Sequence, residues 1–223
     1  MYGMRRRIGD IGDALTIMGE SQARVLVLSW GLSRLGQTPV DIYGLQRGAF
    51  VRHSETVATL TTAIARDRSY PSAGLAYCAG LLHDIGKVAL NAAARRADAR
   101  VEPFQPLLDA GHQSVADLLA MEQASFASTH ATVSQQIAEL WSLPEEIGAA
   151  LASHHQVFTA RDGSLAACVA LANAIAAHAD EQYPACQRPP LPTDSALPLQ
   201  PLLDLARAGS RAGTTKSRRP EAS

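Results

Sequence analysis

The sequence predicts an all-α fold, and three observations support that prediction. Ala and Leu are abundant and aromatic residues make up only 5% of the chain, a composition that favours helices over sheets. Apolar residues recur at helical spacing through most of residues 10–178. The length of 223 residues suits one domain with a tail, or at most two small domains.

Helical spacing of apolar side chains, with capping residues at several ends, defines the predicted helices. One helix is predicted to start at Pro71 and to weaken at Gly86. A kink there separates it from a helical continuation over residues 87–96. Pro144, followed by two acids, is a strong helix start, and Asp162 is the predicted cap of the last helix. The predicted helices are residues 10–19, 22–35, 49–68, 71–86 with the continuation 87–96, 107–110, 114–122, 130–141, 145–155 and 164–178.

The composition changes at about Pro184. Prolines crowd residues 189–201, and residues 207–223 are mainly Arg, Gly, Ser and Thr with little apolar content. Such a segment cannot bury enough apolar surface to offset the entropy lost on ordering, apart from one short helical turn at residues 202–205. We therefore expect a helical domain over residues 1–182 and a Pro-rich, disordered tail over residues 183–223.

Charge and composition exclude several classes of protein. The net charge of −1 gives no electrostatic footprint for nucleic acid or an anionic membrane. No apolar run reaches the roughly 18 residues that a membrane helix needs, and the basic residues 5–7 are not followed by the apolar stretch of a secretory signal. The three cysteines form no CxxC pair, which fits a reducing cytoplasm and argues against a zinc knuckle.

The chemistry of the chain centres on residues 80–87, Gly-Leu-Leu-His-Asp-Ile-Gly-Lys. His83 and Asp84 lie in an apolar run that predicts a buried helix, where polar groups need a compensating partner. Imidazole and carboxylate are good ligands for divalent ions, so one interpretation is a metal site. The other is a hydrogen-bonded His-Asp pair that only braces the core, and these eight residues alone do not separate the two.

Further histidines shift the balance towards a metal. His53, His130, His154 and His155 stand at the ends or inner faces of three other predicted helices, whereas His112 falls in a turn. A lone inward histidine is more often a satisfied core residue than a ligand. Several in one small helical domain, together with a buried acid, are typical of metal sites built between facing helices.

These residues resemble the HD-domain superfamily of metal-dependent phosphohydrolases, and their surroundings resemble its HDOD subgroup. Residues 50–55 are similar to the opening helix of that subgroup, and residues 80–87 to its GLLHDIGK signature. Glu122, His130, Trp141 and residues 144–147 are similar to its E…H…W.LPEEI stretch. The resemblance spans about residues 2–180 and implies an HD-domain-like helical bundle.

The resemblance also implies a set of site residues. Asp84 would bridge two ions, one completed by His53, His83 and Asn173, the other by His130, His154 and His155. Asn173 stands where catalytic relatives carry an Asp, which implies weaker metal binding. The donor set suits iron, manganese or zinc better than magnesium. Lys87 would reach a phosphate oxygen as a catalytic residue, or would be a solvated lysine near the helix end.

HDOD domains carry further helices ahead of the point where this chain begins. The resemblance therefore implies an N-terminal truncation, with Ile11, Leu15 and parts of residues 24–30 more exposed than their apolar character suits. Such a face would favour self-association into a homo-oligomer.

Three functional interpretations remain. The first is a regulatory domain that binds a signalling protein or a small phosphorylated ligand and keeps a metal with little or no catalysis. The second is a working metal-dependent phosphohydrolase. The missing acid, and the absence of the Gly-Tyr-Pro motif that follows the His-His pair in cyclic dinucleotide phosphodiesterases, favour the first. In the third, the histidines are core hydrogen-bonding groups without metal.

Overall fold

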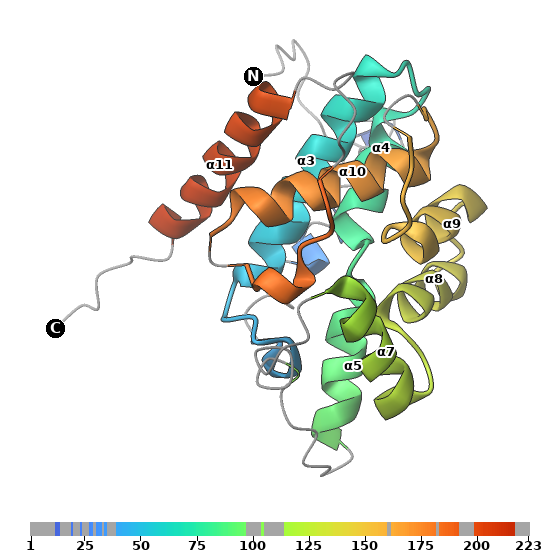
Figure 1. Ribbon diagram of the computed structural model, residues 1–223. Helices are drawn as coiled ribbons and strands as arrows, with labels where there is room; N and C mark the ends of the chain where they lie inside the picture. The colour runs from blue at the N-terminus through green and yellow to red at the C-terminus, as the bar shows by residue number, and fades with distance from the viewer. Residues whose placement is uncertain are drawn as a thin grey trace, which may run out of the picture.

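Helices make up most of the described part of the chain in the computed structural model (Figure 1). The residues described are 12–13, 19, 23, 27–28, 30–32, 34, 39–96, 104, 114–159, 162–181, 183–191 and 199–216. Within these ranges, the only β-type pairing is an isolated bridge between Val40 and Leu45, which brackets the 3-10 helix η1 (Asp41–Tyr43). The all-α prediction is confirmed.

Three helices form the centre of the bundle. The helix α3 (Ala49–Asp67) packs against α4 (Ala73–Leu82) and against α10 (Leu165–Ala179). The helices α4 and α10 are apolar almost all round, because both are enclosed by neighbours, and α10 buries nearly every side chain. These helices carry His53, the His83-Asp84 pair and Asn173 respectively, at or just beyond their ends or within their buried faces.

A second layer completes the bundle around the end of α4. The helix α5 (Ile85–Arg96) packs against α8 (His130–Leu140), which packs against α9 (Glu145–Ser153), and α9 returns to α10 (Figure 1). The helix α7 (Val115–Phe126) precedes α8. Most predicted helix bounds agree with the structure within about two residues. The exceptions are α7, which runs four residues further than predicted, and α4, which ends at Leu82 although the prediction carried it to residue 86.

Hydroxyl side chains begin four of these helices. Ser72, Ser114, Thr129 and Ser164 each accept a hydrogen bond from a backbone N–H in the first turn of the helix that follows. Ser164 therefore replaces Asp162 as the cap of α10. The Asp162 carboxylate instead accepts from the backbone N–H of Ser164 at 2.8 Å, just ahead of the helix.

Much of the N-terminal prediction lies outside the described residues. The predicted helices at residues 10–19 and 22–35 are described only in single positions, and the predicted helix at residues 107–110, like His112, is not described. Ile11 and Leu15 are also outside. Among the residues described there, Val27 is 68% and Trp30 is 65% exposed. No helix in the described ranges is long and apolar enough to cross a bilayer.

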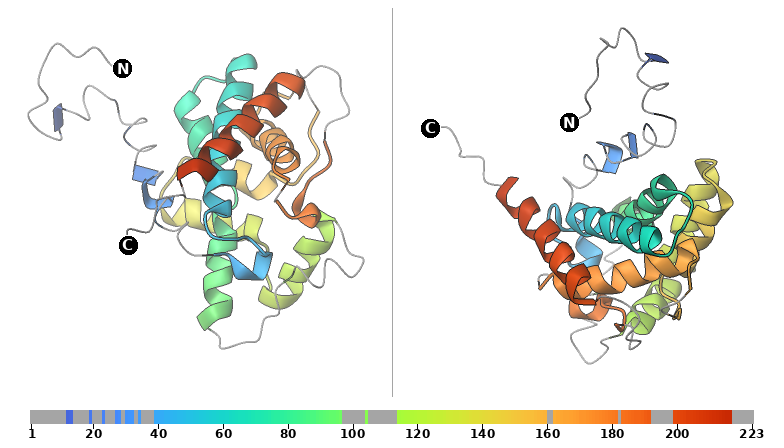
Figure 2. Two further views of the ribbon diagram at one scale, coloured as in Figure 1. Left: turned by 90° about the vertical axis from the view of Figure 1, so that its left-hand side faces the viewer. Right: turned by 90° about the horizontal axis from the view of Figure 1, so that it is seen from above.

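The expectation of a disordered tail over residues 183–223 is wrong for its described part. Residues 185–187 form the 3-10 helix η2 (Ala185–Gln187), and α11 (Leu199–Lys216) lies along α3 and α10 (Figure 2). Leu202 and Ala206, one turn apart, are both buried in this contact. Leu202 and Ala206 lie on the same face of α11, so this face can be buried against the bundle. The average composition of the tail does not reveal such a face.

A close approach between α5 and α8 depends on Gly86. A Cβ atom at this position would overlap the carbonyl oxygen of His130, and the backbone N–H of Gly86 donates to Ser134 Oγ at 2.9 Å. The absence of a side chain therefore brings the start of α8, with His130, against the turn that carries Asp84.

We predict that Gly86→Ala destabilises the protein by about 3 kcal/mol, because backbone atoms must move to accept the methyl group. Gly148→Ala is the matched control, since its Cβ would meet only Gln135 Cγ at an ordinary 3.6 Å and alanine favours the helix. Chemical denaturation measures both. Equal unfolding free energies for the two variants would contradict the assigned role of Gly86.

Candidate metal centre

The His83-Asp84 pair occupies a break between two helices rather than a helix interior. The helix α4 ends at Leu82 and α5 begins at Ile85, so both side chains stand at the junction. The ring Nδ1 of His83 lies 2.9 Å from the carbonyl oxygen of Gly80. The backbone N–H of Lys87 donates to the carbonyl of Asp84 at 2.9 Å, which carries the chain directly into α5.

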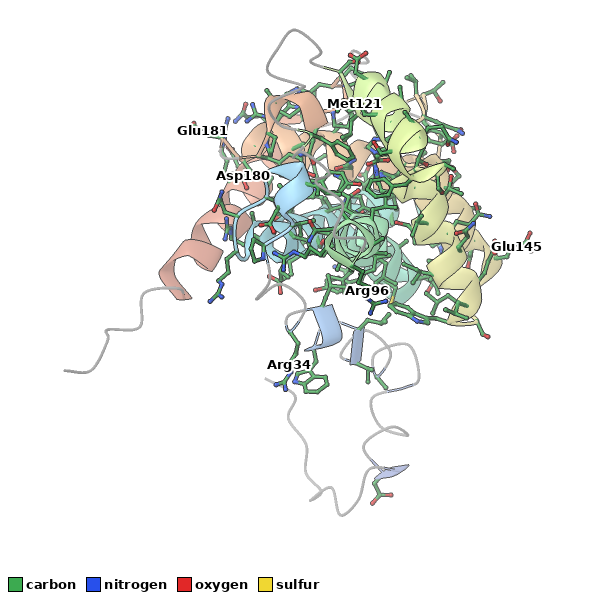
Figure 3. The ribbon with its side chains drawn as sticks, turned by 90° about the horizontal axis from the view of Figure 1, so that it is seen from below. Arg34, Arg96, Met121, Glu145, Asp180 and Glu181 are labelled. Atoms are coloured by element: carbon green, nitrogen blue, oxygen red, sulfur yellow. The ribbon has the colours of Figure 1, made fainter. Side chains whose placement is uncertain are left out.

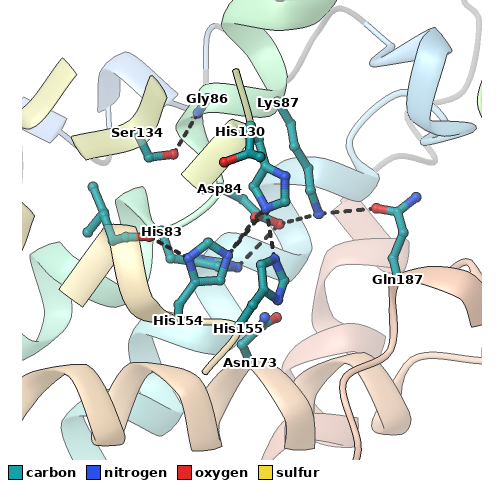
Figure 4. Close-up of polar contacts among 12 residues, drawn as sticks. His83, Asp84, Gly86, Lys87, His130, Ser134, His154, His155, Asn173 and Gln187 are labelled. Atoms are coloured by element: carbon teal, nitrogen blue, oxygen red, sulfur yellow. Dashed lines mark hydrogen bonds and ion pairs between the residues drawn. The ribbon is translucent and has the colours of Figure 1, made fainter. Parts of the chain in front are cut away.

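His130, His154 and His155 reach this junction from α8 and α9 (Figure 4), and His53 reaches it from α3. His53 lies in the second turn of α3, His130 is the first residue of α8, and His154 and His155 follow the last residue of α9. All of these rings except the partly exposed ring of His155 are buried, as is Asp84. The structure therefore brings the predicted histidines and the acid together in one place.

One cluster of four ligand-type side chains, called here the three-histidine group, consists of Asp84, His130, His154 and His155. Asp84 Oδ1 lies 3.3 Å from His130 Nε2 and 3.4 Å from His154 Nε2. His130 Nε2 lies 3.4 Å from His154 Nε2 and 2.8 Å from His155 Nε2. The start of α8 and the end of α9 thus direct three ring nitrogens at the carboxylate of Asp84.

A second cluster, the two-histidine group, shares the same acid and contains His53 and His83. His83 Nε2 lies 3.3 Å from Asp84 Oδ2, and the rings of His53 and His83 are 5.3 Å apart. Asn173 lies beside this group, with Oδ1 at 3.0 Å from His53 Nε2. This division into two clusters around Asp84 is the one that the sequence resemblance implies, and ligation itself stays a prediction.

Hydrogen bonds on the outer side of the rings fix their orientation. Glu122 accepts from the Nδ1–H of His130, while carbonyl oxygens of Gly80 and Leu151 accept from the Nδ1–H of His83 and His154. A histidine that donates through Nδ1 presents its Nε2 lone pair on the opposite side, as metal ligands do. Three lone pairs therefore face the region around Asp84.

The donor set fits a divalent ion. Asp84 Oδ1 and His83 Nε2 are buried without a hydrogen-bond partner, which is costly in an apolar interior. A tetrahedral ion with bonds of about 2.1 Å separates its ligand atoms by about 3.4 Å, and the measured separations in the three-histidine group, 2.8–3.4 Å, are close to this spacing. Nitrogen-rich ligands with one carboxylate suit zinc, iron or manganese.

Burial and neighbouring charges shift the pKa values of the groups in this site. Burial lowers the pKa of His53 to about 3 and that of His154 to about 4. Burial opposes ionisation of Asp84, but His83 and Lys87 outweigh it and hold its pKa well below the usual value. Burial is likewise outweighed at His130, where the Glu122 carboxylate raises the pKa of the ring. Neutral His53 and His154 and an ionised Asp84 are the protonation states that bind metal.

Lys87 is buried, so the alternative of a solvated lysine is wrong. Its Nζ lies 2.7 Å from Asp84 Oδ2 and donates to Tyr183 Oη and Gln187 Oε1, each at 3.1 Å. All three N–H groups of the ammonium thus have acceptors within the protein. The predicted role of Lys87 in contacting phosphate remains untested.

Sequence reasoning missed two residues of the site. Tyr183 and Gln187 come from the segment predicted to be disordered, and both are almost fully buried. The Tyr183 ring stacks on that of His53 at 4.1 Å, and Gln187 donates to the carbonyl of Tyr43 at 2.8 Å. No sequence signal marks either residue. Glu122 was part of the recognised motif, but its contact with His130 emerged only from the fold.

Comparison with known proteins agrees with this geometry. A family model described as HDOD domain matches residues 1–157. A crystal structure of an HDOD domain protein with unknown function from Geobacter sulfurreducens resembles the chain with a TM-score of 0.54 and 20% identity. That match covers 96% of this chain and 72% of the other. No curated protein matches the sequence.

We predict that Glu122→Gln weakens metal binding about 10–100-fold, because His130 loses the charged acceptor that orients its ring. Zinc or manganese titration of the metal-free protein measures the effect. Glu139→Gln, which changes an exposed acid of α8, is the control and leaves affinity unchanged. An unchanged affinity in Glu122→Gln would show that His130 does not ligate the ion.

Proposed function

Because the chain belongs to the HDOD domain family, we propose that it is a regulatory domain of signal transduction. In this proposal the histidine–aspartate cluster holds a divalent ion, and the domain acts by binding a partner, with little or no turnover. The observation that carries the metal assignment is the convergence of buried ring nitrogens on Asp84, with each outer nitrogen of His83, His130 and His154 already hydrogen-bonded.

The surroundings of Asp84 support a role without turnover. Tyr183 covers His53, and Tyr183 and Gln187 occupy two of the three donors of Lys87. A phosphate ester approaching Asp84 from this side would have to displace both side chains. Asn173 also supplies no negative charge to the two-histidine group.

The alternative function is a metal-dependent phosphohydrolase. A bound ion would polarise a phosphate oxygen and lower the pKa of a bound water. In that case the partly exposed His155 marks the side from which a small phosphorylated substrate would enter, because the other ring nitrogens are enclosed.

We expect protein purified without chelator to contain iron, manganese or zinc, and Asp84→Ala to lose it. Asp67→Ala, at the exposed end of α3, is the control and retains the metal. Elemental analysis gives the metal content, and bis-p-nitrophenyl phosphate with added manganese tests turnover. Manganese-dependent hydrolysis that disappears in Asp84→Ala would establish the phosphohydrolase instead.

The surface of α8 and α9 supports the proposal of a protein partner. The partner would bind through a segment that carries both basic and apolar residues. A cavity of about 160 Å³ lies between these helices and is lined by Leu143, Pro144 and Gly148, with the acids Glu139 and Glu145. Glu145 lies at the outer edge of the molecule (Figure 3). The exposed acids Glu139, Glu145 and Glu146 lie on these two helices, and residues 101–160 contain no lysine or arginine. A cationic segment complements such a surface.

Two exposed apolar residues stand at the same end of α8. Leu140 is 80% and Trp141 is 45% exposed. Large apolar side chains beside a cavity and among acids are typical of surfaces that bind a partner. The proposed segment therefore combines arginine or lysine with one apolar anchor residue.

We predict that a cationic peptide with a single Leu or Phe anchor shifts the fluorescence of Trp141 in a Trp30→Phe variant, in which Trp141 is the sole tryptophan. A peptide with Glu in place of the basic residues is the control and has no effect. Salt and Leu140→Ser should both weaken binding at least several-fold. Binding indifferent to both changes, or dimerisation through this surface, would contradict the proposal.

A further inference from the structure

We propose that the centre holds one divalent ion, in the three-histidine group, and that the ammonium of Lys87 takes the place of a second ion beside Asp84. The inference rests on the proposed metal centre and specifies how many ions it binds. It departs from the arrangement that the family resemblance implies, in which Asp84 bridges two ions.

The two oxygens of Asp84 have different surroundings. Oδ2 lies 2.7 Å from Lys87 Nζ and accepts a hydrogen bond from Tyr183 Oη at 3.3 Å. Oδ1 has no hydrogen-bond partner and faces His130 Nε2 and His154 Nε2 at 3.3 and 3.4 Å. One oxygen is thus neutralised by the protein itself, whereas the other is left for an ion in the three-histidine group (Figure 4).

The position of Lys87 is fixed by contacts that do not involve a metal. Its three N–H groups meet Asp84, Tyr183 and Gln187. Gln187 is itself anchored, because its amide N–H donates to the carbonyl oxygen of Tyr43 at 2.8 Å. The rings of Tyr43 and Tyr183 lie 5.6 and 5.7 Å from Nζ. Moving the ammonium aside would leave a buried cation without these partners, which is strongly unfavourable.

The charge of the site supports a single ion. Asp84 and Glu122 are the buried carboxylates in the described part of the site. Two divalent ions with Lys87 would place five positive charges against these two acids, whereas one ion with Lys87 places three. Uncompensated charge among buried side chains is expensive, so the smaller excess is favoured.

The two-histidine group is the weaker of the two clusters. Its only carboxylate oxygen, Asp84 Oδ2, already belongs to Lys87, and Asn173 contributes a neutral amide whose oxygen lies 3.0 Å from His53 Nε2. A cation here would lie close to the ammonium and would gain no carboxylate of its own. We therefore assign the second position to Lys87.

The metal-to-protein ratio tests the inference. The full-length protein is loaded with Mn²⁺, dialysed and measured by elemental analysis, with electron paramagnetic resonance to distinguish an isolated ion from a coupled pair. We expect a ratio near one and the spectrum of an isolated ion. A ratio near two with a coupled spectrum overturns the inference but leaves the metal centre intact, whereas a ratio near zero overturns both.

A double variant tests the role of Lys87 directly. Lys87→Met with Asn173→Asp removes the ammonium and restores an acid, so the ratio should rise to about two and the spectrum should become coupled. Arg95→Met with Asn173→Asp is the control and keeps a ratio of one, because Arg95 is exposed. A folded double variant that still binds one ion contradicts the inference. If the variant does not fold, the spectrum of the wild-type protein decides.

Discussion

The structure depends on the environment of one buried carboxylate. Asp84 lies at the junction of α4 and α5, with Lys87 at 2.7 Å on one side and the rings of His130 and His154 on the other. An ionised group in an apolar interior is tolerated only when its charge is matched by neighbours. The helices of the bundle supply these neighbours from their ends, which is where side chains from different helices can meet.

The helix break at His83 and Asp84 follows from the same constraint. In a continuous helix, these neighbouring residues would point in directions about 100° apart, and only one would face a given partner. The turn between Leu82 and Ile85 lets both side chains reach the common site. Gly86 then allows α8 to approach closely enough for His130 to join them. The backbone geometry that interrupts the helix therefore also brings the side chains of the site together.

The C-terminal segment contributes more to the site and to the packing of the bundle than its composition indicates. Tyr183 and Gln187 close one side of the site through contacts with His53 and Lys87, and α11 packs along the outside of the bundle. Proline-rich composition argues against a core of its own, but a segment can still be ordered by a surface that the rest of the chain provides. The same segment shields Asp84 and thereby links the order of the C-terminal region to the chemistry of the centre.

The sequence alone determined the helical class, most helix bounds and the histidines and acid that gather at the site, because helical periodicity and the motifs around these residues can be recognised in the chain itself. Ordering of the C-terminal segment, and the partners of Lys87, were decided by tertiary structure. Lys87 contacts Tyr183 and Gln187 across about a hundred residues, and no local pattern encodes such contacts. The burial that turns Lys87 from a solvated cation into a counter-ion exists only once distant helices have packed around it.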